Sequence, residues 1–323
     1  MKISSIFFFF NLILFQPVFP ETKTFVRDYT YDAGEADSKL TSRTIALEQV
    51  KRALLEELGV YIQSRTEVEN FMMKKDEILS ITAGITSTVI LEEKWNGEQF
   101  YLKAKIDVDP DDVIKQIDVL RKDTNRTNEL EEVKKIADDA MLEIDRLKKE
   151  LEQVKTEKER SVVQEQYTRA AGIVRSADLM RDAFALFDVG EFEKALDLYS
   201  QVINLNPNNY LAYHNRGCSY ARLGDLNSAM QDLNRSISLN SRYGHAYFTR
   251  SFIRSQMNDN DNAFNDLLKA IELDPNHAMA HYNLGVYYLN AGDQQRSLAH
   301  FKKSARLGFP NAQEYLKKKG IAW

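Results

Sequence analysis

Small, aromatic and turn-forming residues recur with one fixed spacing in the C-terminal half of the chain. Small residues lie 34 positions apart at Ala195, Ala229, Ala263 and Ser297. Glycine, replaced once by asparagine, keeps the same spacing at Gly190, Gly224, Asn258 and Gly292. A fixed period of this length predicts pairs of helices that stack on one another, rather than a single catalytic globule.

The residues at set phases within each period resemble the tetratricopeptide repeat, whose pattern is W-x2-L-G-x2-Y followed by Ala, Phe and Pro. The fourth period shows this pattern at His281, Leu284, Gly285, Tyr288, Ser297 and Phe301. The resemblance covers residues 176–309 as four repeats, and it implies an all-α superhelix. Residues 310–323 then read as a C-terminal capping helix with a polar outer face.

Steric and backbone requirements explain the residue types at two sets of repeated positions. Gly217, Ser251 and Gly285 fall where the two helices of a repeat approach closely, so a large side chain would separate them. The glycines and Asn258 fall at the end of a first helix, where a left-handed backbone is needed.

The concave surface formed by the first helices is the candidate binding site. The predicted lining residues are His214, Asn215, Cys218, Phe248, Thr249, Phe252, Tyr282, Asn283 and Val286. The family resemblance implies that asparagines at such positions hydrogen-bond the backbone of an extended peptide, with the rings forming apolar pockets. Ordinary packing between helices is an equally good interpretation of some of these residues. The positions that form a basic carboxylate clamp in some family members are Met180 and Phe248 here, which does not favour that mode.

Residues 22–120 predict a small α+β domain. A strand over 25–31 precedes a helix over 35–58 that Gly59 ends, and alternation over 60–68 predicts another strand. A short helix over 72–82 follows. Strands over 85–95 and 98–108 are joined by Asn96-Gly97, both of which suit positive φ in a hairpin turn. Pro110 then opens a helix.

In the last of these strands, alternate residues are apolar and predict its core face: Phe100, Leu102, Ala104, Ile106 and Val108. The order of elements resembles the LPP20-like lipoprotein family and the N-terminal domain of flagellar assembly protein T. That resemblance implies an envelope adaptor rather than an enzyme.

Residues 126–160 predict a coiled coil. Apolar residues with alternating spacings of three and four form a heptad seam at Leu130, Val133, Ala137, Ala140, Ile144, Leu147, Leu151 and Val154. Flanking glutamates and lysines suit salt bridges to a parallel copy, for example from Glu129 to Lys134. The pattern therefore predicts homo-oligomerisation through a parallel coiled coil. The alternative is a solitary charged helix used as a spacer.

Residues 1–20 predict a secretory signal peptide. Lys2 precedes an apolar run over 6–15, which is too short for a confident membrane-spanning helix. Export to the periplasm follows, and an uncleaved N-terminal anchor, or peripheral association with the membrane or envelope, stays open. Cys218 is the only cysteine, so no intramolecular disulfide can form.

Charge and motif content narrow the function further. The net charge of −5, with no long basic tract, does not favour nucleic acid as a partner. No catalytic motif, metal-ligand spacing or phosphate-binding loop is recognisable, so neither an enzyme nor a cofactor is expected. The sequence predicts an exported adaptor that binds a protein or peptide partner. The alternatives are a structural component of a secretion or flagellar apparatus and, less favoured, an enzyme acting on envelope polymers.

Overall fold

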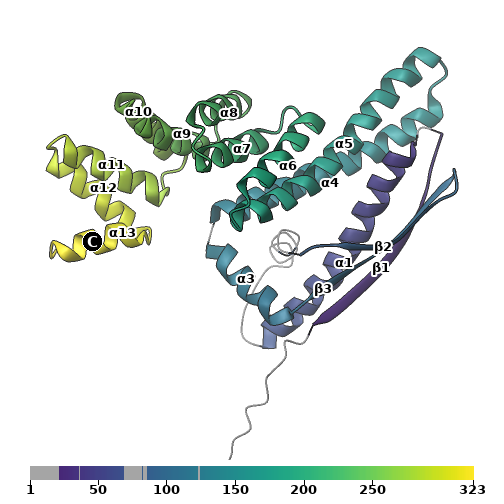
Figure 1. The fold of residues 1–323 in the computed structure, drawn as a ribbon, viewed down its shortest axis with the longest axis horizontal. Helices are drawn as coiled ribbons and strands as arrows, with labels where there is room; N and C mark the ends of the chain where they lie inside the picture. The colour runs from purple at the N-terminus through teal and green to yellow at the C-terminus, as the bar shows by residue number, and fades with distance from the viewer. Residues whose placement is uncertain (1–21, 36, 69–81, 83–85, 123) are drawn as a thin grey trace, which may run out of the picture.

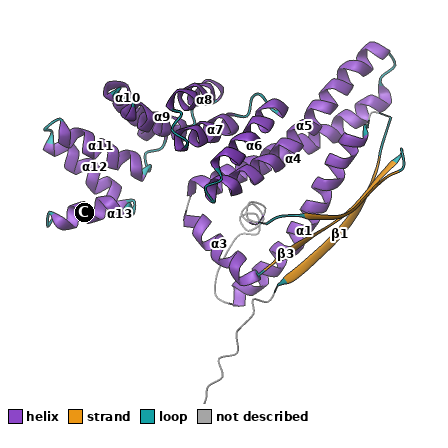
Figure 2. Cartoon of the chain, in the orientation of Figure 1, coloured by secondary structure: helices purple, strands orange, loops and turns teal. Residues whose placement is uncertain are grey.

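A computed structural model of the chain describes residues 22–35, 37–68, 82, 86–122 and 124–323. Its strands lie in the N-terminal part and its C-terminal part is helical (Figures 1 and 2). The N-terminal elements are β1 (Lys23–Asp32), α1 (Lys39–Val68), β2 (Val89–Trp95), β3 (Gln99–Val108) and α3 (Pro110–Lys122). Two long helices follow, α4 (Thr124–Gln153) and α5 (Glu157–Asp188). The remaining helices are α6 (Phe192–Leu205), α7 (Tyr210–Arg222), α8 (Leu226–Leu239), α9 (Gly244–Gln256), α10 (Asn260–Leu273), α11 (Ala278–Asn290), α12 (Gln294–Arg306) and α13 (Pro310–Lys318).

The three strands form one antiparallel sheet in the order β1-β3-β2. The predicted core face of β3, from Phe100 to Val108, is buried as expected. Gly97 has a φ of 101°, whereas Asn96 does not have positive φ. The Asn96 side chain instead accepts hydrogen bonds from the backbone N–H groups of Glu98 and Gln99. The hairpin is therefore confirmed, and the prediction of positive φ at Asn96 is wrong.

The prediction that Gly59 ends a helix and that a strand follows is also wrong. Helix α1 continues through Gly59 to Val68. Leu54, Leu58 and Ile62 are all buried, so one apolar stripe with a spacing of four residues continues past the glycine. Packing of that stripe outweighs the roughly 1 kcal/mol that a glycine costs inside a helix. The short helix expected over 72–82 falls almost entirely outside the described residues.

The coiled-coil segment is half of a helical hairpin within the chain. Helix α4 ends at Gln153, Thr156 caps α5 by accepting a hydrogen bond from the Glu159 N–H, and α5 runs back along α4. The seam residues are buried inside the chain, apart from the partly buried Val154: Leu130, Val133, Ala137, Ala140, Ile144, Leu147 and Leu151. The seam is thus already covered by the chain's own α5. The alternative of a solitary spacer helix is wrong, because α4 packs against α5 and the hairpin belongs to both hydrophobic cores.

The flanking charges also find partners in the same chain. Arg146 pairs with both Glu143 and Glu150, at 2.6 and 2.8 Å. The Lys148 ammonium donates hydrogen bonds to the Tyr31 hydroxyl and to the Asp32 carbonyl. Glu143, Glu150 and Lys148, which the sequence pairs with a parallel copy, thus have partners within one chain.

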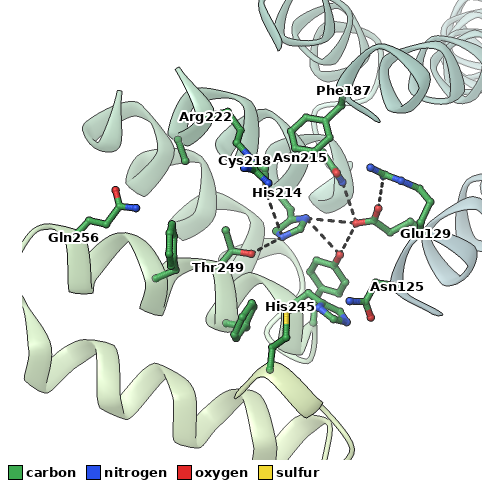
Figure 3. Close-up of a pocket in the computed structure, with 16 residues that line it drawn as sticks. Asn125, Glu129, Phe187, His214, Asn215, Cys218, Arg222, His245, Thr249 and Gln256 are labelled. Atoms are coloured by element: carbon green, nitrogen blue, oxygen red, sulfur yellow. Dashed lines mark hydrogen bonds and ion pairs between the residues drawn. The ribbon is translucent and has the colours of Figure 1, made fainter. Parts of the chain in front are cut away.

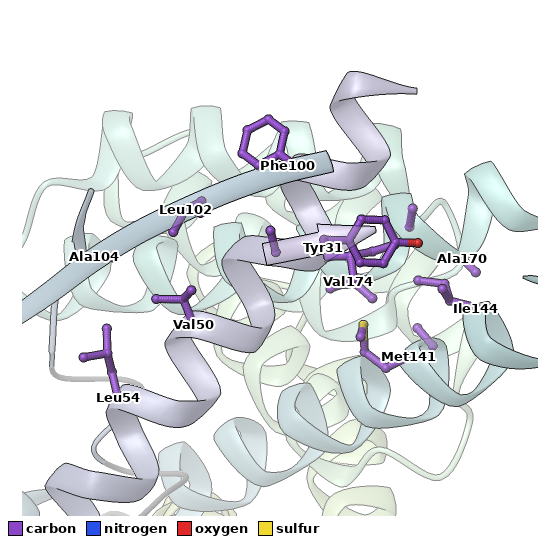
Figure 4. Close-up of a cluster of buried hydrophobic side chains, with 14 of the residues drawn as sticks. Tyr31, Val50, Leu54, Phe100, Leu102, Ala104, Met141, Ile144, Ala170 and Val174 are labelled. Atoms are coloured by element: carbon purple, nitrogen blue, oxygen red, sulfur yellow. The ribbon is translucent and has the colours of Figure 1, made fainter. Parts of the chain in front are cut away.

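The front domain and the hairpin share one hydrophobic core. Figure 4 shows Leu102 of β3, Leu54 of α1 and Ile144 of α4 in this cluster, to which Val174 of α5 also belongs. A second core joins the N-terminal half of α4 and the C-terminal half of α5 to α6 and α7. Helices α4 and α5 therefore belong to both cores, so no flexible linker separates the front domain from the repeats.

The repeats have the predicted local geometry. Gly190, Gly224 and Gly292 have positive φ, as does Asn258 at 62°. A Cβ added at Gly285 would lie 2.7 Å from the Phe301 ring, which confirms the close approach expected there. Helix α13 follows α12 at the end of the stack (Figure 1).

Candidate functional site

The first helices of the repeats are α5, α7, α9 and α11, and they line the concave surface that we call the groove. A cavity of about 580 Å³ lies at its N-terminal end (Figure 3). Six of the nine predicted site residues line this cavity: His214, Asn215, Cys218, Phe248, Thr249 and Phe252. The structure therefore brings together most of the candidate site.

The other three predicted residues lie elsewhere. Asn283 and Val286 line a second cavity of about 250 Å³ between α9, α10 and α11, and Phe252 lines both cavities. Tyr282 lines neither of these two cavities. Its ring packs on Phe301 and Phe309, with centroids 5.4 and 5.1 Å away.

The row containing Tyr282 has a structural role that repeats along the stack. This row consists of His214, Phe248 and Tyr282, and each of their rings contacts the N-cap residue of the helix that begins the following unit: α9, α11 or α13. The pairs are His214–Tyr243 at 5.1 Å, Phe248–His277 at 4.4 Å and Tyr282–Phe309 at 5.1 Å. For this row, contact between neighbouring repeats is the primary role, and only His214 and Phe248 also line the first cavity.

An acidic residue from outside the repeats enters the groove. Glu129 of α4 is buried, and its Oε1 accepts hydrogen bonds from Asn215 Nδ2 at 3.1 Å and from the Tyr243 hydroxyl at 2.7 Å. His214 Nδ1 lies 3.5 Å from the same oxygen. Arg126, which also pairs with Asp188, donates to Oε2 at 2.7 Å. Figure 3 shows this network at one wall of the cavity.

The charges in this network stabilise one another. Burial raises the pKa of Glu129, but His214, Arg126 and Tyr243 outweigh that effect and lower it to about 2. Burial lowers the pKa of His214, but Cys218 and Glu129 outweigh that effect and raise it to about 10. Both groups are therefore charged at neutral pH. The imidazolium has two N–H donors, and its Nε2 lies 3.1 Å from Thr249 Oγ1.

Asn215 is not accessible in the way that a peptide anchor requires. It is only 3% exposed, and its side-chain amide donates to Glu129 and to the Leu211 carbonyl. Thr249 and Asn283, the equivalent residues of the next two repeats, are partly exposed. Of the three equivalent positions, the accessible ones are therefore Thr249 and Asn283.

The opposite wall of the cavity is apolar and accessible. Phe252 is 52% exposed and Met279 is 39% exposed, and both line the cavity. Arg222 lies on the same cavity near Cys218 (Figure 3). This combination can accept an apolar side chain, with polar groups beside it that fix orientation.

Several residues that line this cavity are absent from the sequence prediction, among them Arg126, Glu129, Tyr243 and Met279. Glu129 was assigned to a salt bridge between copies, because sequence spacing alone does not reveal that α4 folds back beside the repeats. Within the described residues, no group of three or more His, Cys, Asp or Glu side chains is arranged to hold a metal ion. No helix in the described ranges is long and apolar enough to cross a membrane.

Comparison with protein families identifies the repeats. Models described as tetratricopeptide or TPR repeats match residues 185–224, 210–243, 244–277 and 267–299. The predicted tetratricopeptide repeats are therefore confirmed over residues 185–299. Such repeats stack into extended concave surfaces.

Solved structures of repeat proteins are also similar. A crystal structure of MamA is 19% identical over 50% of this chain and 99% of its own, with a TM-score of 0.39. The first TPR domain of Spaghetti (RPAP3), bound to the HSP90 peptide SRMEEVD, is 26% identical over 38% of this chain and 91% of its own, with a TM-score of 0.32. YrrB, described as a TPR protein with an unusual peptide-binding site, is 20% identical over 49% and 83%, with a TM-score of 0.38. No curated protein matches the chain. These TM-scores are low, so the identification of the repeats rests on the family models.

Proposed function

We propose that this chain is a non-enzymatic adaptor that binds an extended segment of a partner protein in the groove. The observation that carries the proposal is the exposed apolar surface of Phe252, which lines both cavities, and of Met279, which lines the first. Exposed aromatic residues in a concave site are favourable contacts for a partner. Thr249 and Asn283 lie beside these cavities and supply the polar groups that can pair with a peptide backbone.

Export to the periplasm is part of the same proposal. It rests on the charged start and apolar run within residues 1–20, which lie outside the described residues. In the envelope the front domain would contact one partner while the groove binds another. Oligomerisation through α4 is left out of the proposal, because its seam faces α5 of the same chain.

The test of groove binding is in-cell crosslinking followed by affinity purification of the tagged full chain. Phe252→Ala removes an exposed ring and should preserve the fold, because its side chain is half in solvent. We expect at least one partner to be lost, with affinity reduced roughly 10- to 100-fold as for an interface hot spot. Leu268→Ala on α10 is the matched control, since it also truncates an exposed apolar residue but lines neither of the two cavities.

Identical partner lists for the wild type, Phe252→Ala and Leu268→Ala would refute binding in the groove. A second candidate function, a structural part of a secretion or flagellar apparatus, gives a different result in the same cells. A structural part would sediment with a large assembly, whereas an adaptor would be mostly free of it. Cell fractionation with protease accessibility tests the predicted export separately.

A further inference from the structure

The Glu129 carboxylate is surrounded by hydrogen-bond donors from the second repeat and the cap that follows it. Asn215 comes from α7, His214 is its neighbour on the same helix, and Tyr243 is the cap residue of α9. Asn215 and Tyr243 donate hydrogen bonds to Oε1, His214 Nδ1 lies 3.5 Å from the same oxygen, and Arg126 pairs with Oε2. A carboxylate has two oxygens that only accept hydrogen bonds, so this set of donors matches its chemistry.

The next repeat does not reproduce this set. The residues equivalent to Asn215 and Tyr243 one repeat later are Thr249 and His277. His277 Nδ1 accepts a hydrogen bond from the Ala280 N–H, so it caps its own helix. The residue equivalent to His214 is Phe248, which has no polar group. Of these two repeats, only the second therefore offers the full set of donors, where Arg126 and Glu129 of α4 line the cavity.

We propose that Asn215, Tyr243 and His214 form a carboxylate-binding site in the second repeat, and that Glu129 of α4 is its resident ligand. Leu130 and Val133, next to Glu129 on α4, are buried with Phe184 in the core that α4 shares with the repeats. The ligand is therefore held by packing as well as by charge. Because α4 continues into the front-domain core through Ile144, this site fixes the repeats to the front domain.

The resident carboxylate has a consequence for the partner, and this consequence alone rests on the proposed function. An incoming peptide cannot accept a hydrogen bond from Asn215, because both N–H groups of that amide are occupied. Among the equivalent positions Asn215, Thr249 and Asn283, Thr249 is then the first whose polar group is left for the peptide.

Chemical rescue tests the carboxylate site without any partner. Glu129→Ala in the full chain removes the carboxylate and one carbon, which is the size of acetate. We expect the melting temperature to fall by about 5–10 °C, as for removal of one partner of a buried ion pair. Adding 100 mM sodium acetate should then raise it by about 3 °C relative to sodium chloride of equal ionic strength. The wild type and Glu143→Ala, an exposed glutamate on the same helix, should show no such difference.

An acetate effect no larger in Glu129→Ala than in the wild type would overturn the site. If Glu129→Ala does not fold, Glu129→Gln keeps the shape and removes the charge, and the His214 ring is followed by NMR. We expect its pKa to fall by at least one unit in Glu129→Gln, whereas a glutamate that merely fills space would leave that pKa unchanged. An unchanged pKa would therefore overturn the proposal. Neither measurement depends on partner binding, so failure here is distinct from failure of the proposed function.

Discussion

The front of the molecule and its repeats build their cores in different ways. The front domain and the hairpin share one large cluster whose members come from β1, α1, β3, α3, α4 and α5. The later repeats instead have small separate clusters, such as Leu267, Ala270, Ala280 and Leu284. A stack of this kind is stabilised mainly by contacts between neighbours. A core truncation should therefore destabilise many elements in the front part, but only the neighbouring helices in the repeats.

The largest expected effect comes from matched truncations in the two regions. Leu54→Ala in α1 and Leu284→Ala in α11 each remove a side chain with no exposed surface. Each should lower the free energy of unfolding by about 2–5 kcal/mol. Hydrogen exchange should show faster opening of the sheet, α4 and α5 in Leu54→Ala, but only of α9 to α13 in Leu284→Ala. If both variants sped up hydrogen exchange over equally many elements, the difference between the two regions would be refuted.

Adding a methyl group, instead of removing a side chain, tests how closely two helices of a repeat approach each other. In Gly285→Ala the new methyl group would meet the Phe301 ring at 2.7–3.0 Å. We expect a loss of about 1–3 kcal/mol, measured by denaturant unfolding. The double variant Gly285→Ala/Phe301→Leu should lose less than the sum of the two single variants, because the smaller side chain relieves the clash. Additive losses would show that the close approach is not the cause.

A change of pH should weaken the repeats near α11 selectively. Burial and the nearby His245 lower the pKa of His277 to about 4, below the unfolded value of about 6.5. Between these values the unfolded chain binds a proton that the folded chain does not, so stability falls as the pH decreases from 7 to 5. His277→Asn should remove about 2 kcal/mol of that loss. Asn209 caps α7 at the equivalent position, accepting from the Ala212 N–H at 3.0 Å, so the substitution should preserve the cap.

Melting curves at pH 7 and pH 5 measure this effect. The wild type and His277→Asn should differ more at pH 5 than at pH 7. A constant difference would mean that His277 does not carry the pH dependence. His281 and His300, whose pKa values burial also lowers, would then be the next residues to replace.

The smallest expected effect is at Asn258. Its φ of 62° is the left-handed conformation that glycine adopts at the equivalent Gly224. Asn258→Gly should raise stability by at most about 1 kcal/mol, and Gly224→Asn should lower it by a similar amount. Urea unfolding of both variants measures the pair. A loss of stability in Asn258→Gly would show that the asparagine side chain, rather than the backbone, determines this turn.

The repeats can be predicted from the sequence because the backbone conformation or helix contact at each key position permits only certain residue types. A left-handed turn selects Gly224, and a close helix approach selects Gly285, whatever the rest of the chain does. The β2–β3 hairpin was predictable for the same reason. The helix through Gly59 was not, because packing of Ile62 against the core decided it, and a local rule does not contain that information.

The hairpin could have been found in the sequence. Val163, Tyr167, Ala170, Val174 and Ala177 of α5 are buried with spacings of four and three, which is a second seam. Thr156 and Glu159 between the helices form the signature of a helix start. A heptad seam looks the same whether its partner is a second copy or the next helix of one chain. The spacing of the seam alone therefore does not distinguish an oligomer from a hairpin within one chain.

The sequence predicts the groove as a surface, but it does not predict that Asn215 is covered. Phe252 and Thr249 line the cavity as expected, since their positions follow from the repeat period. The burial of Asn215 depends on Glu129, which lies 86 residues earlier in the chain. Only the folded arrangement of α4 brings the two together.

Helix α5 lies in the front-domain core along its first half and forms the first helix of the repeats along its second half. At 1.5 Å per residue, its 32 residues span about 48 Å without a joint. Two partners bound at its two ends would face each other at a fixed separation and angle. Their effective concentration would then depend on how this rigid geometry matches their own attachment points, rather than on the reach of a tether.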